Sequence, residues 1–362
     1  MNAKKFAFLI HPRSQVSSDI TRLFNFAPLR LIPDGTYEAA MKRLPIPPLV
    51  TGQLRRSDAP NETAGWLVTV PLGARQLLEL PRRFVQDKVA QAVDKAAELG
   101  AEIVGLGALT APATLGGKTL EARQDVGITN GNAFTAAMTW MGIQRLLSRL
   151  PSDPHIAVVG ATGSVGSCLI ELLAKRPLSP RLTLVARHQG RLEALAKKVR
   201  CDSLQINVST DMNSVREADL VVLLTSSSEA LLGSEHLKHG AVILDDTQPR
   251  NTDPSLQTQR PDVLIVDGGL VEAPGIIMRG RVGLPKNMLY ACLAETILLG
   301  LEGHSGHFGI GAPKLEQAEY MLTVARKHAK LGFHLAPLHS FGQLLEPVQT
   351  PVRVAANAAG FA

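Results

Sequence analysis

Cys292 is the residue whose type and setting most favour nucleophilic chemistry. The pattern from Asn287 to Gly303 predicts a helix introduced by Pro285-Lys286-Asn287, so the cysteine would lie in its second turn. A helix N-terminus and a nearby cation such as Lys286 both lower a thiol pKa and supply thiolate. Thiolate with a nicotinamide cofactor is suited to reducing a thioester to an aldehyde. A helical cysteine among Leu and Ala is more often a small core residue, so both interpretations stay open.

A glycine-rich segment predicts a dinucleotide site. Gly160, Gly163 and Gly166 form G-x-x-G-x-x-G directly after an apolar strand and at the start of a helix. The first glycine permits a tight turn, the second lets the backbone approach a pyrophosphate, and the third lets the helix lie close to the sheet. The free N–H groups of the helix N-terminus then face the phosphates. The predicted cofactor-binding residues of this turn are Gly160, Ala161, Thr162, Gly163, Ser164, Val165 and Gly166.

Two arginines indicate which dinucleotide is bound. Folds that bind NAD usually place an acid after the second strand, where it holds the ribose 2′-hydroxyl; this chain has Arg187 there, with Arg191 four residues later. A guanidinium can pair bidentately with a 2′-phosphate, so we predict NADPH as the cofactor, although Arg187 could also be an exposed strand-end residue. Thr225, in the polar loop after the fourth strand, is a further candidate for contact with the cofactor or a helix cap.

Three other polar residues are candidates for the reacting centre. Asn130 and Asn132 flank a glycine in a turn that opens a helix, which suits holding a carboxamide or a thioester carbonyl; Asn132 could equally be a helix cap. Lys286 could pair with a thiolate or a phosphate, or face water. The three cysteines show no paired spacing, and His304-x-x-His307 lies in a glycine-rich turn without an obvious third ligand, so we predict no metal.

The elements that must position these residues alternate between strand and helix. Apolar β-branched strands and helices follow one another from His155 to Val266, which implies a parallel sheet covered on both faces. We predict an α/β fold: a Rossmann-type parallel-sheet domain, preceded by a smaller α/β substrate domain, with C-terminal helices packing back. The Pro-containing linker near Pro151 sets the boundaries at 1–150 (acyl or substrate domain), 151–285 (NADP(H) domain), 286–335 (C-terminal helices completing the active site) and 336–362 (a loosely ordered tail).

Composition restricts the function classes. The chain of 362 residues is 45% hydrophobic and 19% charged, which is globular and excludes fibrous or wholly disordered classes. No apolar run is long enough for a membrane helix, and three cysteines suit a reducing compartment, so we expect a cytoplasmic protein that is not an integral membrane protein. Residues 1–150 hold 18 Lys and Arg against 12 Asp and Glu, whereas the remainder holds 20 of each. This net charge of +6 could attract an acidic partner or be ordinary surface charge; without aromatic platforms, nucleic acid is not expected.

Nearly the whole chain, about residues 6–335, resembles the cyanobacterial long-chain acyl-[acyl-carrier-protein] reductases. The most specific is Tyr290-Ala291-Cys292-Leu293-Ala294-Glu295, because the cysteine of the matching segment carries the acyl group in that family. The other matching segments are Arg82-Arg83-Phe84, Leu106-Gly107-Ala108-Leu109-Thr110, Ile128-Thr129-Asn130-Gly131-Asn132-Ala133-Phe134-Thr135-Ala136, Val159-Gly160-Ala161-Thr162-Gly163, Ala186-Arg187 with Arg191-Leu192, and Asp267-Gly268-Gly269-Leu270-Val271-Glu272.

The resemblance implies NADPH-dependent reduction of a fatty acyl thioester to a fatty aldehyde, with Cys292 as the acyl carrier and acyl-carrier protein or coenzyme A as the donor. The acidity of acyl-carrier proteins would suit the basic first part of the chain. One rival reading is a shikimate-dehydrogenase-like enzyme, in which Lys88 and Asp125 oxidise an alcohol and Cys292 is inert. Another is a binding protein that senses NADPH without chemistry. The sequence carries no signal for an oligomeric state.

Overall fold

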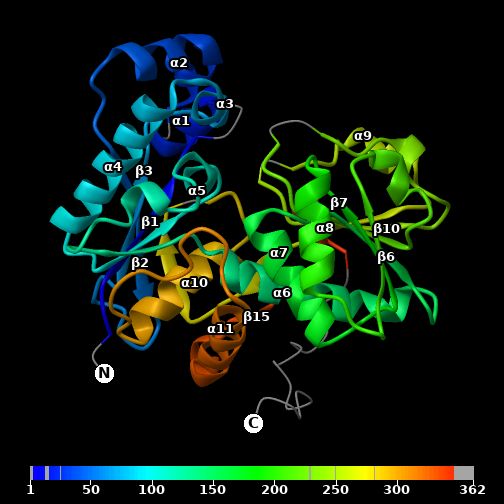
Figure 1. Ribbon diagram of the computed structural model, residues 1–362. Coiled ribbons are helices and arrows are strands. Elements are labelled where there is room, and N and C mark those ends of the chain that lie inside the picture. Colours follow the sequence, from blue (N-terminus) through cyan, green and yellow to red (C-terminus); the bar gives the residue numbers. More distant parts are fainter. Residues whose placement is uncertain are drawn as a thin grey trace. The chain divides into compact units, whose positions relative to one another are not determined.

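The computed structural model describes residues 3–12, 16–24, 26–227, 230–248, 250–280 and 282–345. The chain divides into two compact units, each assembled from separate segments (Figure 1). Unit 1 comprises Met1–Gly131, Pro274–Gly283 and Cys292–Gly311. Unit 2 comprises Asn132–Ala273, Leu284–Ala291 and Ala312–Ala362. Both units contain a six-stranded sheet with helices, which confirms the predicted α/β fold.

Unit 1 is built on a mixed sheet with the strand order β13-β2-β3-β1-β4-β5. Four strands run parallel, and β2 and β13 extend the sheet by antiparallel pairing. The bounds are β1 (Phe6–Ile10), β2 (Leu49–Arg56), β3 (Gly65–Thr69), β4 (Ile103–Leu106), β5 (Gly127–Thr129) and β13 (Ile276–Arg279). The helices are α1 (Val16–Phe24), η1 (Ala27–Leu31), α2 (Asp34–Arg43), α3 (Ala74–Glu79), α4 (Arg82–Glu98), α5 (Thr110–Ala113), η2 (Lys118–Leu120) and α10 (Ala291–Leu301), whose first residue still belongs to unit 2.

Opposite faces of this sheet pack against α4 and α10. The alternation of strand side chains sends Leu9, Val68 and Val104 to the face that buries the apolar side of α4. On the other face, glycines let α10 lie directly on the strands: a Cβ on Gly105 would stand 1.9 Å from Thr296 Oγ1. This close approach fixes α10, and with it Cys292, against β4.

Unit 2 holds an all-parallel sheet with the order β11-β10-β9-β6-β7-β8. Counted from β6, this is the 3-2-1-4-5-6 order of dinucleotide-binding folds. The bounds are β6 (His155–Val159), β7 (Arg181–Val185), β8 (Gln205–Ser209), β9 (Leu220–Leu223), β10 (Val242–Asp245) and β11 (Leu264–Asp267). All strands of this sheet except β8 are largely buried, as expected for an apolar parallel sheet covered on both faces.

The helices of unit 2 are α6 (Asn132–Leu146), η3 (Leu147–Arg149), α7 (Ser164–Lys175), α8 (Gln189–Lys198), η4 (Met212–Val215), η5 (Ser234–His236), α9 (Ser255–Gln259), α11 (Leu315–Lys327) and η6 (Ala329–Leu331). A small antiparallel sheet joins β14 (Met288–Tyr290), β12 (Leu270–Glu272) and β15 (His334–Leu335). The last hairpin pairs β16 (His339–Ser340) with β17 (Gln343–Leu344).

The unit boundary lies earlier in the chain than the linker near Pro151. Helix α6 belongs to unit 2, because its small residue Gly142 lets it pack closely against Leu244 of β10. The C-terminal helices also separate: nearly all of α10 lies in unit 1 and α11 in unit 2. Residues 336–345 of the expected loose tail form β16 and β17, and residues 346–362 lie outside the described part of the chain.

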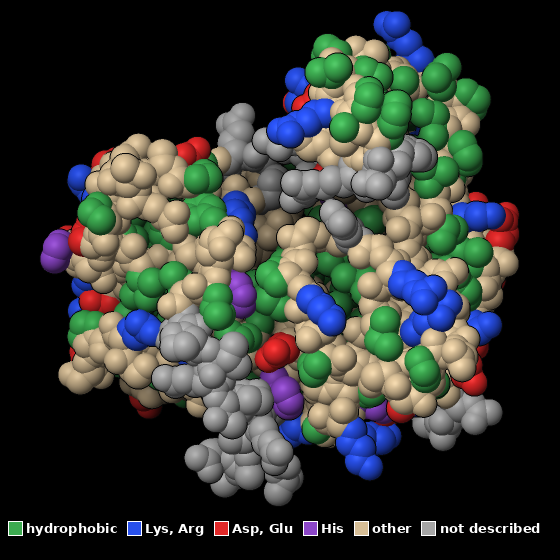
Figure 2. Space-filling view, turned by 180° about the vertical axis from the view of Figure 1, so that it is seen from behind, with side chains coloured by type: hydrophobic (Ala, Val, Ile, Leu, Met, Phe, Trp, Pro, Cys, Tyr) green, Lys and Arg blue, Asp and Glu red, His purple; other side chains and the backbone are tan. Residues whose placement is uncertain are grey.

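Unit 1 exposes apolar side chains near its α1–α2 region. Figure 2 shows hydrophobic side chains gathered on this part of the unit. In this region of the chain, Leu31 is 85% exposed and Phe26 and Leu44 are 57% and 56% exposed.

Candidate functional site

Cys292 is the second residue of α10, one turn nearer the helix start than the sequence pattern predicts. Asn287 adopts a positive φ of 66°, and Met288–Tyr290 then form strand β14 instead of a first helical turn. Ala291 follows this strand, and its N–H donates to the carbonyl of Gly269. The helix therefore starts at Ala291, and the first N–H groups of α10 surround the cysteine.

Three backbone N–H groups hydrogen-bond to the Cys292 thiol. Two come from the start of α10, Cys292 itself and Leu293, and the third comes from Ala108 in the turn after β4. On the opposite side, Gly131 packs against the cysteine backbone: a Cβ at Gly131 would stand 2.2 Å from the Cβ of Cys292. This position, with a φ of 73°, therefore requires glycine. The three N–H groups around the sulfur can stabilise a negative charge on it.

The thiol is nevertheless protonated at rest. Burial, helped by the Glu295 carboxylate and opposed by the three N–H groups, raises the pKa of the Cys292 thiol to about 12. The prediction of a lowered thiol pKa was therefore wrong, because desolvation outweighs the helix N-terminus. Lys286, the expected cation, is exposed in the loop before β14 and is not among the groups that act on the thiol pKa.

A buried hydrogen-bonded chain holds the turn that packs on Cys292. The N–H of Gly131 donates to Thr129 Oγ1 over 3.2 Å, and Thr129 Oγ1 donates to Glu295. Glu295 is fully buried, three residues after the cysteine. Asn130 donates its side-chain amide to the carbonyls of Gly116 (3.1 Å) and Gly311 (2.8 Å), so it ties two loops together. Glu295 and Asn130 therefore hold the loops around Cys292 in place, and these hydrogen bonds go to residues other than Cys292.

The glycine turn of unit 2 has the shape that a pyrophosphate requires. Gly160 has a φ of 86°, and a Cβ there would meet the Leu224 carbonyl oxygen at 2.7 Å. A Cβ on Gly166 would stand 2.4 Å from the Gly160 carbonyl oxygen, and α7 begins at Ser164. Neighbouring backbone atoms therefore fill the positions that a Cβ would take at these two glycines. The turn lies at the N-terminus of α7, and a helix N-terminus is where a phosphate binds. Ala161, Thr162 and Val165 complete the turn, and the residues present fit a dinucleotide.

Asn132 and Thr225 order loops of this unit. Asn132, the first residue of α6, donates its side-chain amide to Ser164 Oγ over 2.8 Å, so it joins α6 to the glycine turn. Asn130 and Asn132 thus belong to different units, which their spacing of two residues did not suggest. Thr225 Oγ1 donates to Asn251 and accepts the N–H of Ser227 at 3.2 Å, which holds the loop after β9.

Arg187 and Arg191 are available to a phosphate. Arg187 lies two residues after the end of β7 and Arg191 lies in the first turn of α8, and both side chains are exposed. Within the part of the chain that the structure describes, neither guanidinium has a hydrogen bond or ion pair. Both therefore keep their donors for a ligand at the carboxyl end of β7.

Asp246, which the sequence did not point to, directly follows β10 and is half-buried, with its carboxyl group turned inward. Burial, helped by the neighbouring Asp245 and opposed by the hydrogen bond with Thr139, raises the pKa of its carboxyl to about 7. Thr139 Oγ1 lies against one carboxyl oxygen and also donates to the Thr135 carbonyl over 2.8 Å. A hydroxyl has one hydrogen, so a protonated Asp246 donating to Thr139 completes the chain. The other carboxyl oxygen has no hydrogen-bond partner among the described residues.

We expect Asp246→Asn to stabilise unit 2 at neutral pH. Below about pH 4 the carboxyl is protonated in both states. Between pH 4 and 7 the Asp246 carboxyl ionises in the unfolded chain but stays protonated in the folded one. Asp246 therefore lowers the free energy of unfolding increasingly as the pH rises, by about 4 kcal/mol at most. An amide keeps the donor to Thr139 without ionising. Urea unfolding at pH 4 and pH 7 should show a gain that grows with pH.

Asp245→Asn is the matched control for this prediction. Asp245 is buried too, but its carboxylate accepts hydrogen bonds from the N–H groups of Thr247, Asn251 and Thr252. Its replacement should therefore destabilise unit 2. Equal or lower stability of Asp246→Asn at pH 7 would contradict the account.

The structure does not pair Lys88 with Asp125. Lys88 is buried, and its Nζ donates to the Ile46 carbonyl at 3.3 Å. Asp125 is exposed and binds Arg123 over 2.5 Å, and Arg123 also binds Asp94. Each group has its own partner, so the Lys–Asp arrangement needed to oxidise an alcohol is not formed by these two residues.

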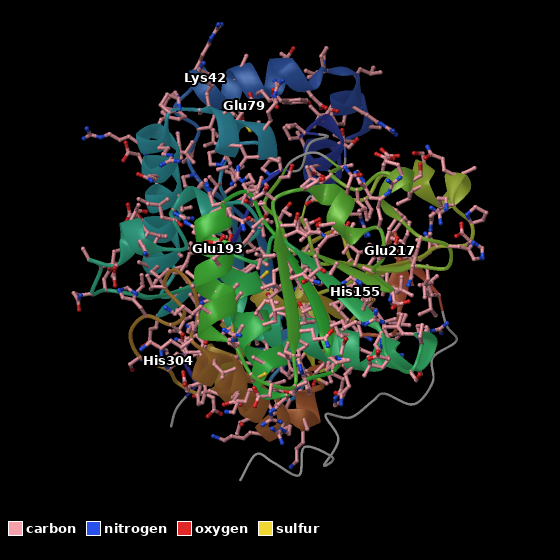
Figure 3. The ribbon with its side chains drawn as sticks, turned by 45° about the vertical axis from the view of Figure 1, so that its right-hand side comes forward. Lys42, Glu79, His155, Glu193, Glu217 and His304 are labelled. Carbon is pink, nitrogen blue, oxygen red and sulfur yellow. The ribbon has the colours of Figure 1, made fainter. Side chains whose placement is uncertain are left out.

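Other titratable groups are engaged in structure. His155 lies at the amino end of β6, beside Glu217 (Figure 3), and its ring hydrogen-bonds with the Glu217 carbonyl oxygen and Thr183 Oγ1. No group of three or more His, Cys, Asp or Glu within the described ranges could hold a metal ion. Among the helices of those ranges, none is long and apolar enough to cross a bilayer.

Comparisons with known proteins connect this chain to reductases. The family model described as shikimate / quinate 5-dehydrogenase matches residues 144–267. A long-chain acyl-[acyl-carrier-protein] reductase from Synechococcus elongatus is 27% identical over 215 residues, 57% of this chain and 61% of the relative. A glutamyl-tRNA reductase from a Synechococcus species is 27% identical over 186 residues, 48% of this chain and 42% of the relative.

A longer match is to the aminotransferase PigE of a Serratia species, which is 26% identical over 350 residues, 94% of this chain and 41% of PigE. The chain spans about half the length of the curated relatives it matches. The family match and the glycine turn support an α/β domain that binds NADP(H). The resemblance to acyl-[acyl-carrier-protein] reductases, expected from residue 6 to 335, is found over a shorter part of the chain.

Proposed function

We propose that this protein reduces a long-chain fatty acyl thioester to a fatty aldehyde with NADPH, through an acyl group held on Cys292. The observation that carries the proposal is the Cys292 thiol itself, which accepts three backbone N–H groups at the start of α10. The similarity to an acyl-[acyl-carrier-protein] reductase supports the choice of substrate class.

The first step is an exchange of thioesters. The Cys292 sulfur attacks the acyl carbonyl carbon, the bond from that carbon to the donor sulfur breaks, and the donor leaves as a thiol with the proton lost by Cys292. Because the thiol pKa is about 12, attack requires transfer of this proton as the new bond forms. The N–H groups of Ala108 and Leu293 stabilise negative charge on the sulfur, and Gly131 keeps the approach to Cys292 free of a side chain.

The glycine turn of unit 2 would hold the cofactor. The N–H groups at the start of α7 bind the pyrophosphate, Asn132 fixes Ser164 of that turn, and Arg187 with Arg191 binds the 2′-phosphate. When bound, NADPH supplies the hydride that reduces the acyl carbon to an aldehyde and frees Cys292. Thr225 holds the neighbouring loop, and Lys286, exposed before β14, is a candidate contact for a donor phosphate.

The donor would be acyl-carrier protein or acyl-coenzyme A. In this proposal residues 1–150, with the C-terminal helices of 286–335, bind the acyl donor, and 151–285 bind NADP(H). The excess of basic residues in 1–150 favours an acidic carrier protein, because opposite charge raises the rate of encounter.

The test is aldehyde formation by the purified protein from palmitoyl-coenzyme A and from palmitoyl-acyl-carrier protein. We expect fatty aldehyde with NADPH and far less with NADH. Reduction of a ketone or oxidation of an alcohol, without any aldehyde from thioesters, would favour the shikimate-dehydrogenase-like alternative that the family match to residues 144–267 suggests. NADPH binding without turnover of either substrate would favour a sensor.

A further inference from the structure

His11 lies at the carboxyl end of β1, in a place that the proposed mechanism does not use. Its Nε2 accepts the N–H of Leu109 over 3.2 Å. Its Nδ1 lies 2.9 Å from the Pro12 carbonyl oxygen, to which it donates. The imidazole is therefore neutral with its proton on Nδ1, since Nε2 must keep a lone pair for Leu109.

The turn that His11 holds is the one that faces the cysteine. Leu109 directly follows Ala108, whose N–H reaches the Cys292 thiol. Ala108 has a φ of 45°, an uncommon backbone conformation for a residue with a side chain. Such a conformation persists only where its surroundings fix it.

Other bonds fix the ends of this turn. The N–H of Gly107 donates to the Leu9 carbonyl over 3.0 Å, and Thr110 Oγ1 donates to the Gly107 carbonyl over 2.7 Å. His11 supplies the side-chain acceptor for the N–H next to Ala108. Loss of that acceptor would leave a partly buried N–H without a partner and release the strained residue.

We infer that His11 is a positioning residue for Cys292: its neutral ring holds the Ala108–Leu109 turn so that the Ala108 N–H points at the sulfur and makes the thiol more reactive. This inference rests on the proposed role of Cys292 as nucleophile. It names a function for a residue that acts through the backbone and does not itself contact the reacting atoms.

The arrangement makes cysteine reactivity sensitive to acid. Protonation of Nε2 replaces the acceptor with a donor that faces the Leu109 N–H, so the turn loses its anchor. Burial lowers the pKa of His11, while the Pro12 carbonyl and Asp19 of α1 raise it, so the ring stays neutral at pH 7. Glu295 is the charged group that acts on the cysteine end of the turn.

The experiment measures the reaction of Cys292 with 2,2′-dipyridyl disulfide between pH 4.5 and 8, in the full chain with Cys168 and Cys201 replaced by alanine. His11→Leu should lower the rate constant at pH 7.5 about tenfold. His11→Gln, whose side-chain oxygen can accept the Leu109 N–H without titrating, should stay within about twofold of the parent. In the parent, the logarithm of the rate should fall with a slope near 1 per pH unit and become steeper than 1 over the acid range in which His11 is protonated. In His11→Gln the slope should stay near 1.

His339→Gln is the matched control, because His339 also donates from Nδ1 to a nearby carbonyl, that of Pro337, but belongs to unit 2. It should leave both the rate and the slope unchanged. Parent-like reactivity of His11→Leu, or the same bend in His11→Gln as in the parent, would overturn the inference. Aldehyde formation is measured separately. If the His11 variants change the thiol reactivity as expected but the parent protein forms no aldehyde, the proposed function is wrong and the role of His11 stands.

Discussion

Cys292→Ala is expected to abolish aldehyde formation from acyl thioesters, by a factor of at least about 10⁴ in kcat. Covalent catalysis divides the reduction into acyl exchange and hydride transfer, and without the sulfur neither step has its intermediate. The three N–H groups that now face the thiol would remain, but they would have no charge to stabilise. The measurement is the initial rate of NADPH oxidation together with aldehyde detection by mass spectrometry.

The other two cysteines provide matched controls. Cys168 is buried in α7, where its thiol contacts the Lys314 carbonyl at 3.9 Å, and Cys201 lies beside Ser203. Cys168→Ala and Cys201→Ala should keep at least half of the activity, because neither cysteine lies at the start of α10. Aldehyde formation at the wild-type rate by Cys292→Ala would contradict the role of Cys292.

Arg187→Ser is expected to raise the KM for NADPH by about 100-fold and to leave the KM for NADH within about twofold. A guanidinium–phosphate pair is charge-assisted and bidentate, and its loss costs about 2–3 kcal/mol, of which 1.4 kcal/mol is a factor of ten. NADH lacks the 2′-phosphate, so it loses nothing. Arg191→Ser should act in the same direction with a smaller effect, because Arg191 lies four residues further along the chain, in the first turn of α8.

Arg200→Ser is the control for this prediction, because Arg200 is also exposed but lies after the far end of α8. Its kinetics with both cofactors should match the parent protein. If Arg187→Ser raises the KM for NADH as much as for NADPH, the arginine does not recognise the 2′-phosphate.

The sequence was sufficient to predict the dinucleotide-binding sheet. Its strands are apolar and β-branched, and backbone contacts leave no room for a Cβ at Gly160 or Gly166. These patterns lie within short segments, so they can be recognised without knowing which distant residues the segments contact. The antiparallel strands of unit 1 and the small sheet of unit 2 gave no comparable signal, because their partners lie far apart in the sequence: β2 pairs with β13, more than 200 residues later.

The electrostatics of the candidate site depended on burial, which the sequence does not state. The pattern around Cys292 predicted a helix N-terminus, and the N–H groups are there, but desolvation dominates and raises the thiol pKa to about 12. Ala108 was beyond prediction for another reason: it acts through its backbone N–H, which every residue except proline carries. Asp246 could not be singled out from the sequence, because it stands next to a second aspartate. Only the structure shows that the carboxylate of Asp245 accepts several hydrogen bonds and that of Asp246 does not.

The most direct test of the central claim is the intact mass of the protein after mixing with palmitoyl-coenzyme A in the absence of NADPH. We predict an increase by one palmitoyl group, located on Cys292 by peptide mapping, that disappears with release of palmitaldehyde when NADPH is added. A protein that forms aldehyde but never carries the acyl group, or that carries it on another residue, would contradict the account.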